Sequence, residues 1–154
     1  MTTRHHREFL LDSGAVTELA HNHKLRASYE FSLTHKYYGS LRIPRIVRTE
    51  IHTGKQRRDA LVELMINRLT RTADPYIDIT PELIDRAGVL RTEALKTGRK
   101  RKKRNISGID ALVVAIAEAL SYTSAVTIVT TDLEDIGDLV TATGRSNIAV
   151  RLPG

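Results

Sequence analysis

The sequence contains no cysteine, which excludes disulfide bonds and metal sites built from thiolate ligands. It also lacks long apolar segments. The longest unbroken apolar run, Ala111 to Ala117, is far shorter than the roughly 20 residues that a membrane-spanning helix needs. The first twelve residues have a basic start but no apolar stretch of the length found in signal peptides. We therefore expect a cytoplasmic protein that does not enter a membrane.

No repeat, low-complexity tract or linker rich in proline, glycine and serine divides the 154 residues. A chain of this length typically forms one domain and buries about 68–70% of the surface that its unfolded form exposes. We expect residues 1–154 to form a single domain with its own core.

The basic excess of the chain is confined to one segment. The net charge is +6, and six consecutive basic residues follow one another at Arg99, Lys100, Arg101, Lys102, Lys103 and Arg104. Without this basic run, 18 basic residues remain to balance the 18 acidic ones. Such a run suits RNA binding, because each neutralised phosphate releases counterions. A solvated surface loop of the same composition is the alternative.

Short apolar segments alternate with amphipathic ones along the chain. Strands are predicted at residues 9–11, 41–43, 76–79, 126–129 and 148–152. Helices are predicted at residues 15–20, 22–38, 44–54, 61–69, 80–98, 107–120 and 133–143. The second of these carries an apolar stripe (Leu25, Tyr29, Leu33 and Tyr37), which we expect to pack on the core. The fourth is an amphipathic helix that runs through Leu61, Leu64, Met65 and Leu69. The alternation predicts an α/β fold with a mostly parallel central sheet and helices on both faces.

Carboxylates follow two of the predicted strands. Asp12 comes directly after the first strand, and Asp132 follows the strand at 126–129 with Asp135 three residues later. Ligands of parallel sheets bind beyond the carboxyl ends of the strands, so these acids are placed to hold one. The same residues are also suited to cap the helices that follow. The residues alone leave both roles open.

Glu50 lies on the apolar face of the helix predicted at residues 44–54, so we expect its carboxylate to point into the apolar layer. A buried carboxylate without a partner is costly, which predicts either an ion pair with Arg45 or Arg48 or a bound cation. Asp110 lies in the first turn of the most apolar helix, three residues after Ser107, a spacing that also makes a capping box.

Gathering four or five such carboxylates requires a compensating cation. Two unit charges 4 Å apart interact with about 4 kcal/mol at an effective dielectric constant near 20. Ligands that are all oxygen favour hard ions such as Mg²⁺ or Mn²⁺. One or two such ions can activate water and stabilise the leaving oxygen in phosphodiester hydrolysis.

Four segments of the chain resemble, in the same order, the motifs of the PIN-domain ribonucleases, and most of all those of VapC-type toxins from bacterial toxin–antitoxin pairs. They are residues 10–15 (LLDSGA), 48–51 (RTEI), 108–115 (GIDALVVA) and 129–136 (VTTDLEDI). The resemblance implies a three-layer α/β/α fold and endoribonuclease activity that depends on one or two Mg²⁺ or Mn²⁺ ions. It also implies RNA as substrate, a small antitoxin protein as partner and a homodimer.

The resemblance further implies catalytic and metal-binding roles for Asp12, Glu50, Asp110 and Asp132. It makes Asp135 a fifth, supporting metal ligand, with Ser13 and Thr130 lining the pocket. Two features depart from the family, namely a longer segment from 21 to 40 and the basic run.

Two other functions compete with this interpretation. One is a PIN-fold module that binds RNA or a partner without cutting, and loss of any one of the four principal acids would have favoured it. The other is a metal-dependent phosphatase, which typically needs an Asp-x-Asp motif where this chain has Asp12, Ser13 and Gly14.

Overall fold

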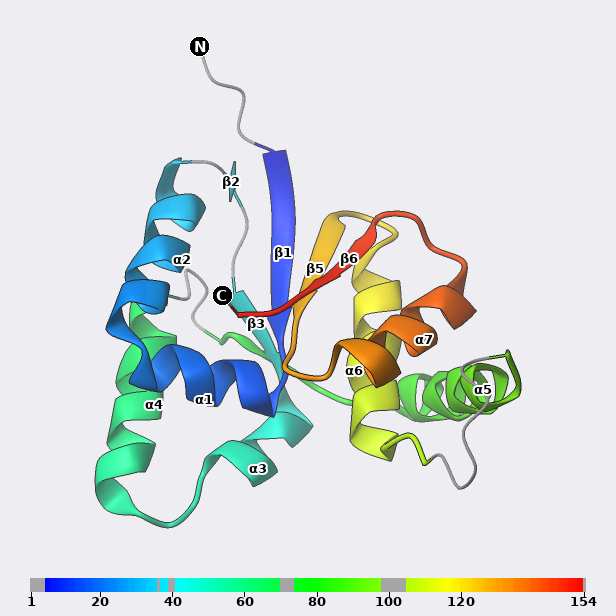
Figure 1. Cartoon of the computed structure of the whole chain (residues 1–154), viewed down its shortest axis with the longest axis horizontal. Helices are drawn as coiled ribbons and strands as arrows, with labels where there is room; N and C mark the ends of the chain where they lie inside the picture. The colour runs from blue at the N-terminus through cyan, green and yellow to red at the C-terminus, as the bar shows by residue number, and fades with distance from the viewer. Residues whose placement is uncertain (1–4, 36, 39–40, 70–73, 98–104, 154) are drawn as a thin grey trace.

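The computed structural model describes residues 5–35, 37–38, 41–69, 74–97 and 105–153 (Figure 1). Its middle layer is a sheet with the strand order β4-β3-β1-β5-β6, in which a short strand, β2, pairs with the start of β1. The strands are β1 (His5–Leu11), β2 (Tyr37–Tyr38), β3 (Leu41–Pro44), β4 (Tyr76–Ile77), β5 (Ala125–Val129) and β6 (Ile148–Arg151). All pairings among these described strands are parallel, so the predicted α/β class is confirmed.

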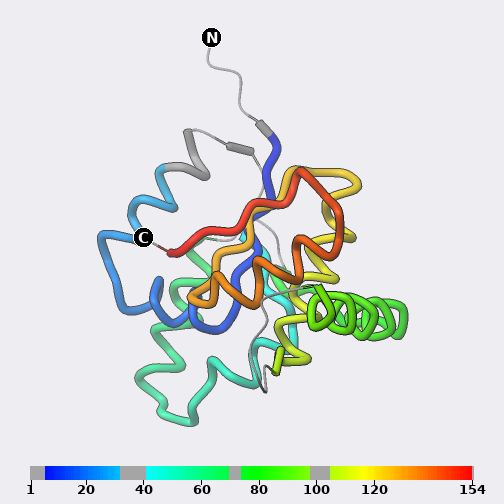
Figure 2. Tube along the Cα trace, turned by 45° about the vertical axis from the view of Figure 1, so that its right-hand side comes forward, coloured from blue at the N-terminus to red at the C-terminus, as the bar shows by residue number. Residues whose placement is uncertain are grey.

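Helices cover both faces of this sheet (Figure 1). One side carries α1 (Ser13–His21), α2 (His23–His35) and α4 (Gln56–Leu69), which contact one another. The other side carries α5 (Pro81–Thr97), α6 (Gly108–Leu120) and α7 (Leu133–Thr143). Figure 2, turned by 45°, shows α5 as the outer helix of its side. The sheet and its two helical layers form the three-layer arrangement that the sequence predicts.

The helix that is apolar almost all round, α6, packs against the sheet, α5 and α7. Its side chains are buried from Val113 to Glu118, as a helix of this composition requires. The one charged member, Glu118, accepts two hydrogen bonds from the guanidinium of Arg86 on α5, at 2.7 and 2.8 Å. This bidentate ion pair satisfies the buried carboxylate and ties α5 to α6.

The structure differs most from the sequence prediction in the region between α2 and α4. The helix predicted at 22–38 ends at His35, and Tyr37 lies in β2 instead, because its backbone pairs with His5 of β1. Pro44 is the last residue of β3 rather than part of a helix, since the pairing of β3 with β4 keeps it extended. The helix predicted at 44–54 is therefore reduced to a 3-10 turn, η1 (Arg45–Val47), and one α-helical turn, α3 (Arg48–Ile51).

Two smaller corrections concern α4 and β4. The helix α4 forms as predicted, but its buried face consists of Val62, Met65, Ile66 and Leu69. Leu61 and Leu64, predicted to share that face, are 38% and 66% exposed. The strand predicted at 76–79 covers only the two residues of β4. Among the helices of the described ranges, none has the length and apolar character needed to cross a membrane.

Candidate metal centre

The two acids that follow strands lie at the same edge of the sheet. The ends of β1 and β5 pair in register, Leu11 with Val129, so the segments that continue from them are neighbours. Asp12 caps α1 by accepting a hydrogen bond from the backbone N–H of Ala15 at 2.9 Å. Asp132 caps α7 by accepting one from the N–H of Asp135 at 3.1 Å. Capping therefore fixes the orientation of both carboxylates at the edge where a ligand can bind.

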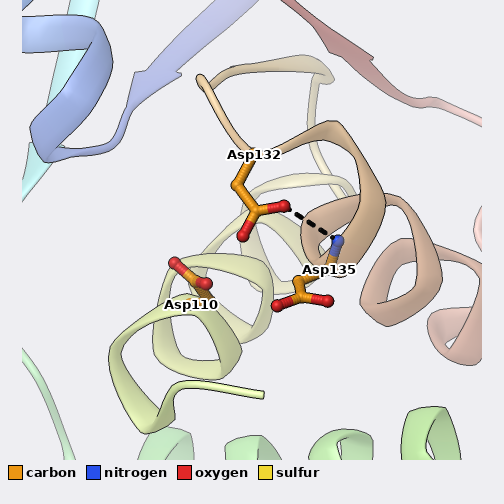
Figure 3. A group of neighbouring side chains, drawn as sticks. All are labelled: Asp110, Asp132 and Asp135. Atoms are coloured by element: carbon orange, nitrogen blue, oxygen red, sulfur yellow. Dashed lines mark hydrogen bonds between the residues drawn. The ribbon is translucent and has the colours of Figure 1, made fainter. Parts of the chain in front are cut away.

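Three carboxylates converge beside this edge. One oxygen each of Asp110, Asp132 and Asp135 lies within 4.8 Å of the others. Figure 3 shows that Asp110 comes from α6 and faces the two acids at the start of α7. The start of α6 is fixed by Ser107, whose hydroxyl accepts a hydrogen bond from the N–H of Ile109 at 3.1 Å. The arrangement offers a cation oxygen ligands from two helices, and all three residues are half-buried.

Asp12 lies deeper than these three and is linked to them through Thr130. The Asp12 side chain is buried, and its Oδ2 accepts a hydrogen bond from the Thr130 hydroxyl. The same hydroxyl oxygen accepts a hydrogen bond from the backbone N–H of Asp132 at 2.9 Å. Thr130, which is fully buried, thus fixes Asp12 relative to the loop that carries Asp132.

Glu50 is exposed, so the prediction that it points into the apolar layer is wrong. Its helix is a single turn at the edge of the sheet, where a carboxylate can face outward and stay hydrated. Its Oε2 accepts a hydrogen bond from the Ser13 hydroxyl at 2.6 Å, which brings it to the start of α1. The predicted arginine partners, Arg45 and Arg48, form their ion pairs elsewhere, with Asp74, Asp78 and Glu63.

All five predicted acids contribute to one electrostatic field. Burial, followed by the negative charges of the other four acids, raises the pKa of Asp110 from 3.8 to about 6. Burial also raises the pKa of Asp12, while the hydrogen bonds from Thr130 and Ala15 oppose the shift and the charges of Asp132 and Glu50 add to it. Such mutual repulsion is what a cation bound between the carboxylates would relieve.

The start of α1 lies so close to the loop after β5 that a side chain at position 14 would crowd Thr131. A Cβ on Gly14 would lie 2.3 Å from Oγ1 of Thr131, 3.1 Å from its Cγ2 and 3.2 Å from its Cβ. Rotating the threonine side chain can turn its γ atoms away, but its Cβ stays 3.2 Å from the added carbon, which is closer than ordinary van der Waals contact. A larger residue at position 14 would therefore push apart the segments that carry Asp12 and Asp132. The sequence shows this glycine within its motif but not the close approach that requires it.

The structure thus groups the predicted site residues differently from the sequence. Asp135, predicted as a supporting ligand, belongs to the tight group with Asp110 and Asp132, whereas Asp12 and Glu50 stand beside that group. Ser13 and Thr130 each hold one of these two neighbouring acids. The basic run at 99–104 lies outside the described residues.

No family model matches the sequence, and no curated protein matches it. Solved structures do match. A chain of the VapBC2 complex from Rickettsia felis, bound to a DNA fragment from its promoter, matches with a TM-score of 0.64 and 17% identity over 94% of this chain and 98% of that one. A chain of FitAB bound to an IR36 DNA fragment matches with a TM-score of 0.63 and 17% identity over 94% of each chain. A chain of VapBC-1 from nontypeable Haemophilus influenzae matches with a TM-score of 0.62 and 14% identity over 95% of this chain and 98% of that one.

These matches, which extend over nearly the whole chain, define the fold as that of a PIN domain. Within that class the chain is similar in fold to the matching chains of the VapBC and FitAB complexes. The resemblance predicted from four short motifs is confirmed as a likeness of fold.

Proposed function

We propose that this protein is a metal-dependent endoribonuclease and the toxin of a type II toxin–antitoxin pair. The observation that carries the proposal is the convergence of Asp110, Asp132 and Asp135 within 4.8 Å, with Asp12 and Glu50 near enough to raise the pKa of Asp110. The PIN-domain fold supports the same assignment, because its carboxylates meet at the edge of the sheet where such folds bind ligands.

The donor set fits a hard divalent cation. Asp110, Asp132 and Asp135 offer only oxygen, which suits Mg²⁺ or Mn²⁺, and Asp12 and Glu50 are placed to serve a second ion or an attacking water. Such a cation, when bound, supplies an acidified water and stabilises the developing charge in phosphodiester hydrolysis. The chain supplies the positions of the ligands, and Asp110 must lose any proton it holds before it can coordinate.

The test of this function is cleavage by the purified protein of structured and unstructured RNA, with Mn²⁺ or with EDTA. We expect cutting within the RNA chain in Mn²⁺ and none in EDTA. RNA binding that depends on metal but never leads to cleavage would instead favour the module that binds without cutting.

We propose that the basic run at residues 99–104 binds the phosphates of RNA. In the chain it connects α5 to α6, whose first turn carries Asp110. Replacing all six residues by serine should weaken RNA binding and reduce the slope of log affinity against log salt by about 0.7 for each phosphate of a single strand that is no longer neutralised. Turnover of a short substrate at saturation should persist, because the acids are untouched. Binding titrations between low and high salt measure the slope, and an unchanged slope would leave the run as a solvated loop.

We also propose a small antitoxin protein as partner, and a homodimer as the toxin's own assembly, both on the resemblance to VapC-type toxins. The surface of α4 supports a protein partner: Leu61 and Leu64 are exposed and line a hollow of about 110 Å³ together with Arg26, Met65 and Arg68. Apolar side chains gathered at a hollow are typical of contact surfaces.

Production of the wild type alone should therefore arrest bacterial growth, and production of the antitoxin from the adjacent reading frame should relieve the arrest. Leu64→Glu should resist this relief while the purified variant still cleaves RNA, because the substitution removes an apolar contact and the new carboxylate beside Arg26 and Arg68 must lose its hydration when the partner covers it. Leu95→Glu, at an exposed leucine of α5, serves as the matched control and should be neutralised normally. Neutralisation of Leu64→Glu as efficient as that of the wild type would place the antitoxin on another surface.

A further inference from the structure

The helix that carries Glu50 is too short to hold its own position. Only four residues form α3, and an isolated helical turn is unfavourable because its hydrogen bonds do not offset the ordering of the backbone. Its turn must therefore be held by side chains from other elements. On the side of α1, the Ser13 hydroxyl binds Glu50 itself.

Both ends of α3 also lie against one carboxylate, that of Glu63 on α4. The Nη2 of Arg48, the first residue of α3, donates a hydrogen bond to Oε1 of Glu63 at 3.3 Å. The Nε2 of His52, the residue directly after α3, lies 3.0 Å from the same oxygen, although without the geometry of a hydrogen bond. Tyr76 of β4 donates a further hydrogen bond to it through its hydroxyl, at 3.4 Å.

Neighbouring contacts reinforce this arrangement. Asp59 precedes Glu63 by four residues, so both side chains lie on one face of α4. Its Oδ1 accepts a hydrogen bond from the N–H of Thr53 at 3.0 Å and lies 3.6 Å from Nδ1 of His52. The guanidinium of Arg48 also stacks over the ring of Tyr76, 4.6 Å from its centre. Residues 48–53 thus contact α4 and β4 through several side chains.

We infer that Glu63 is a positioning residue for the nuclease site: it holds α3 so that Glu50 stays beside Ser13 and the acidic cluster. The inference rests on the proposed function for its effect on catalysis, but the ordering of α3 by Glu63 can be measured without any activity. Single exposed ion pairs contribute little, yet here one oxygen lies beside three groups: Arg48 of α3, the half-buried His52 directly after α3, and Tyr76 of β4.

The catalytic test uses Glu63→Ala, Glu63→Gln and the control Glu93→Ala, which removes a carboxylate from the exposed surface of α5. Loss of a residue that orients a metal ligand typically costs about 10–100-fold in activity or metal affinity, and we expect such a loss of kcat/KM in Glu63→Ala. Glu63→Gln should recover most of it, because its amide oxygen still accepts from Arg48 and Tyr76. The control should match the wild type.

A double-variant cycle separates positioning from a general structural role. If Glu63 acts through Glu50, adding Glu63→Ala to Glu50→Gln should cause little further loss, because the group that it positions is already disabled. An equal loss in both backgrounds would overturn the inference. Full activity of Glu63→Ala alone would overturn it as well.

The ordering of α3 is read separately with a nitroxide label. Because the chain has no cysteine, Thr49→Cys on the exposed side of α3 gives a single labelling site. The label should move faster in the Glu63→Ala background and remain unchanged with Glu93→Ala. Identical spectra in all three backgrounds would contradict the inference even if the nuclease is active. Failure of the wild type to cut any RNA would instead contradict the proposed function, and the label would still show whether Glu63 orders α3.

Discussion

Asp110→Asn is expected to slow RNA cleavage by more than about 100-fold. Losing a residue that only supports the metal ligands costs up to about 100-fold, and losing one of the ligands should cost more. Asp110 is the acid whose pKa responds to all four others, so it lies at the electrostatic centre of the site. Asparagine has the same shape but offers one neutral oxygen, which weakens the attraction for a divalent cation. The measurement is initial cleavage rates of a labelled RNA over a range of Mn²⁺ concentrations.

RNA binding by this variant should be retained or become tighter, because removing a negative charge lowers repulsion of the phosphate backbone. Asp12→Asn, Glu50→Gln and Asp132→Asn should each be similarly defective, and their losses should not add, since one incomplete ligand set already disables the site. The position of Asp135 in the tight group predicts a loss in Asp135→Asn comparable to that in Asp132→Asn.

The matched control is Asp85→Asn, which removes the same charge from the exposed surface of α5. It should cleave at the wild-type rate. Undiminished cleavage by Asp110→Asn, or by the wild type in EDTA, would defeat the metal mechanism.

The parts of the site that the sequence predicted well are those fixed by local signals. Asp12 and Asp132 directly follow buried strands and precede helices, so one short segment determines both the cap and the edge of the sheet where it lies. The position of Asp110 is also set by local signals, because the apolar helix α6 must pack in the centre of the protein and Ser107 marks where it begins. In each case the residues that set the position are neighbours in the chain.

The prediction of where the Glu50 side chain lies was wrong because contacts between residues far apart in the chain determine its position. Helical periodicity predicted one helix over 44–54, but pairing of β3 with β1 and β4 keeps the chain extended through Pro44. What remains of the helix depends on Glu63, His52 and Tyr76, and nothing in the spacing of these residues indicates that they meet. The same limit explains α4, where periodicity identified the helix but not which of its leucines the core would use.

The metal-free protein should lose stability as the pH rises from about 4 to 7. The native pKa of Asp110 is raised to about 6, so the folded chain keeps a proton that the unfolded chain, with a pKa near 3.8, has already released. Below about pH 3 both states are protonated and the penalty is absent; above about pH 7 it is complete. The shift corresponds to at most about 3 kcal/mol, and solvent screening of this half-buried group reduces it to about 1–2 kcal/mol.

Asp110→Asn removes this penalty, since asparagine carries no charge at any of these pH values. In EDTA at pH 7 the variant should therefore be about 1–2 kcal/mol more stable than the wild type, and the difference should vanish at about pH 3. Manganese should make the wild type the more stable of the two at pH 7, because a ligand present at 100 times its dissociation constant adds about 2.7 kcal/mol to the state that binds it.

Urea unfolding at several pH values, with manganese or with EDTA, measures both effects, and Asp85→Asn controls for the loss of one charge outside the cluster. A wild-type unfolding curve that millimolar manganese does not move would exclude the metal site. A pH-independent difference between Asp110→Asn and the wild type would show that burial and the neighbouring acids do not raise the pKa of Asp110.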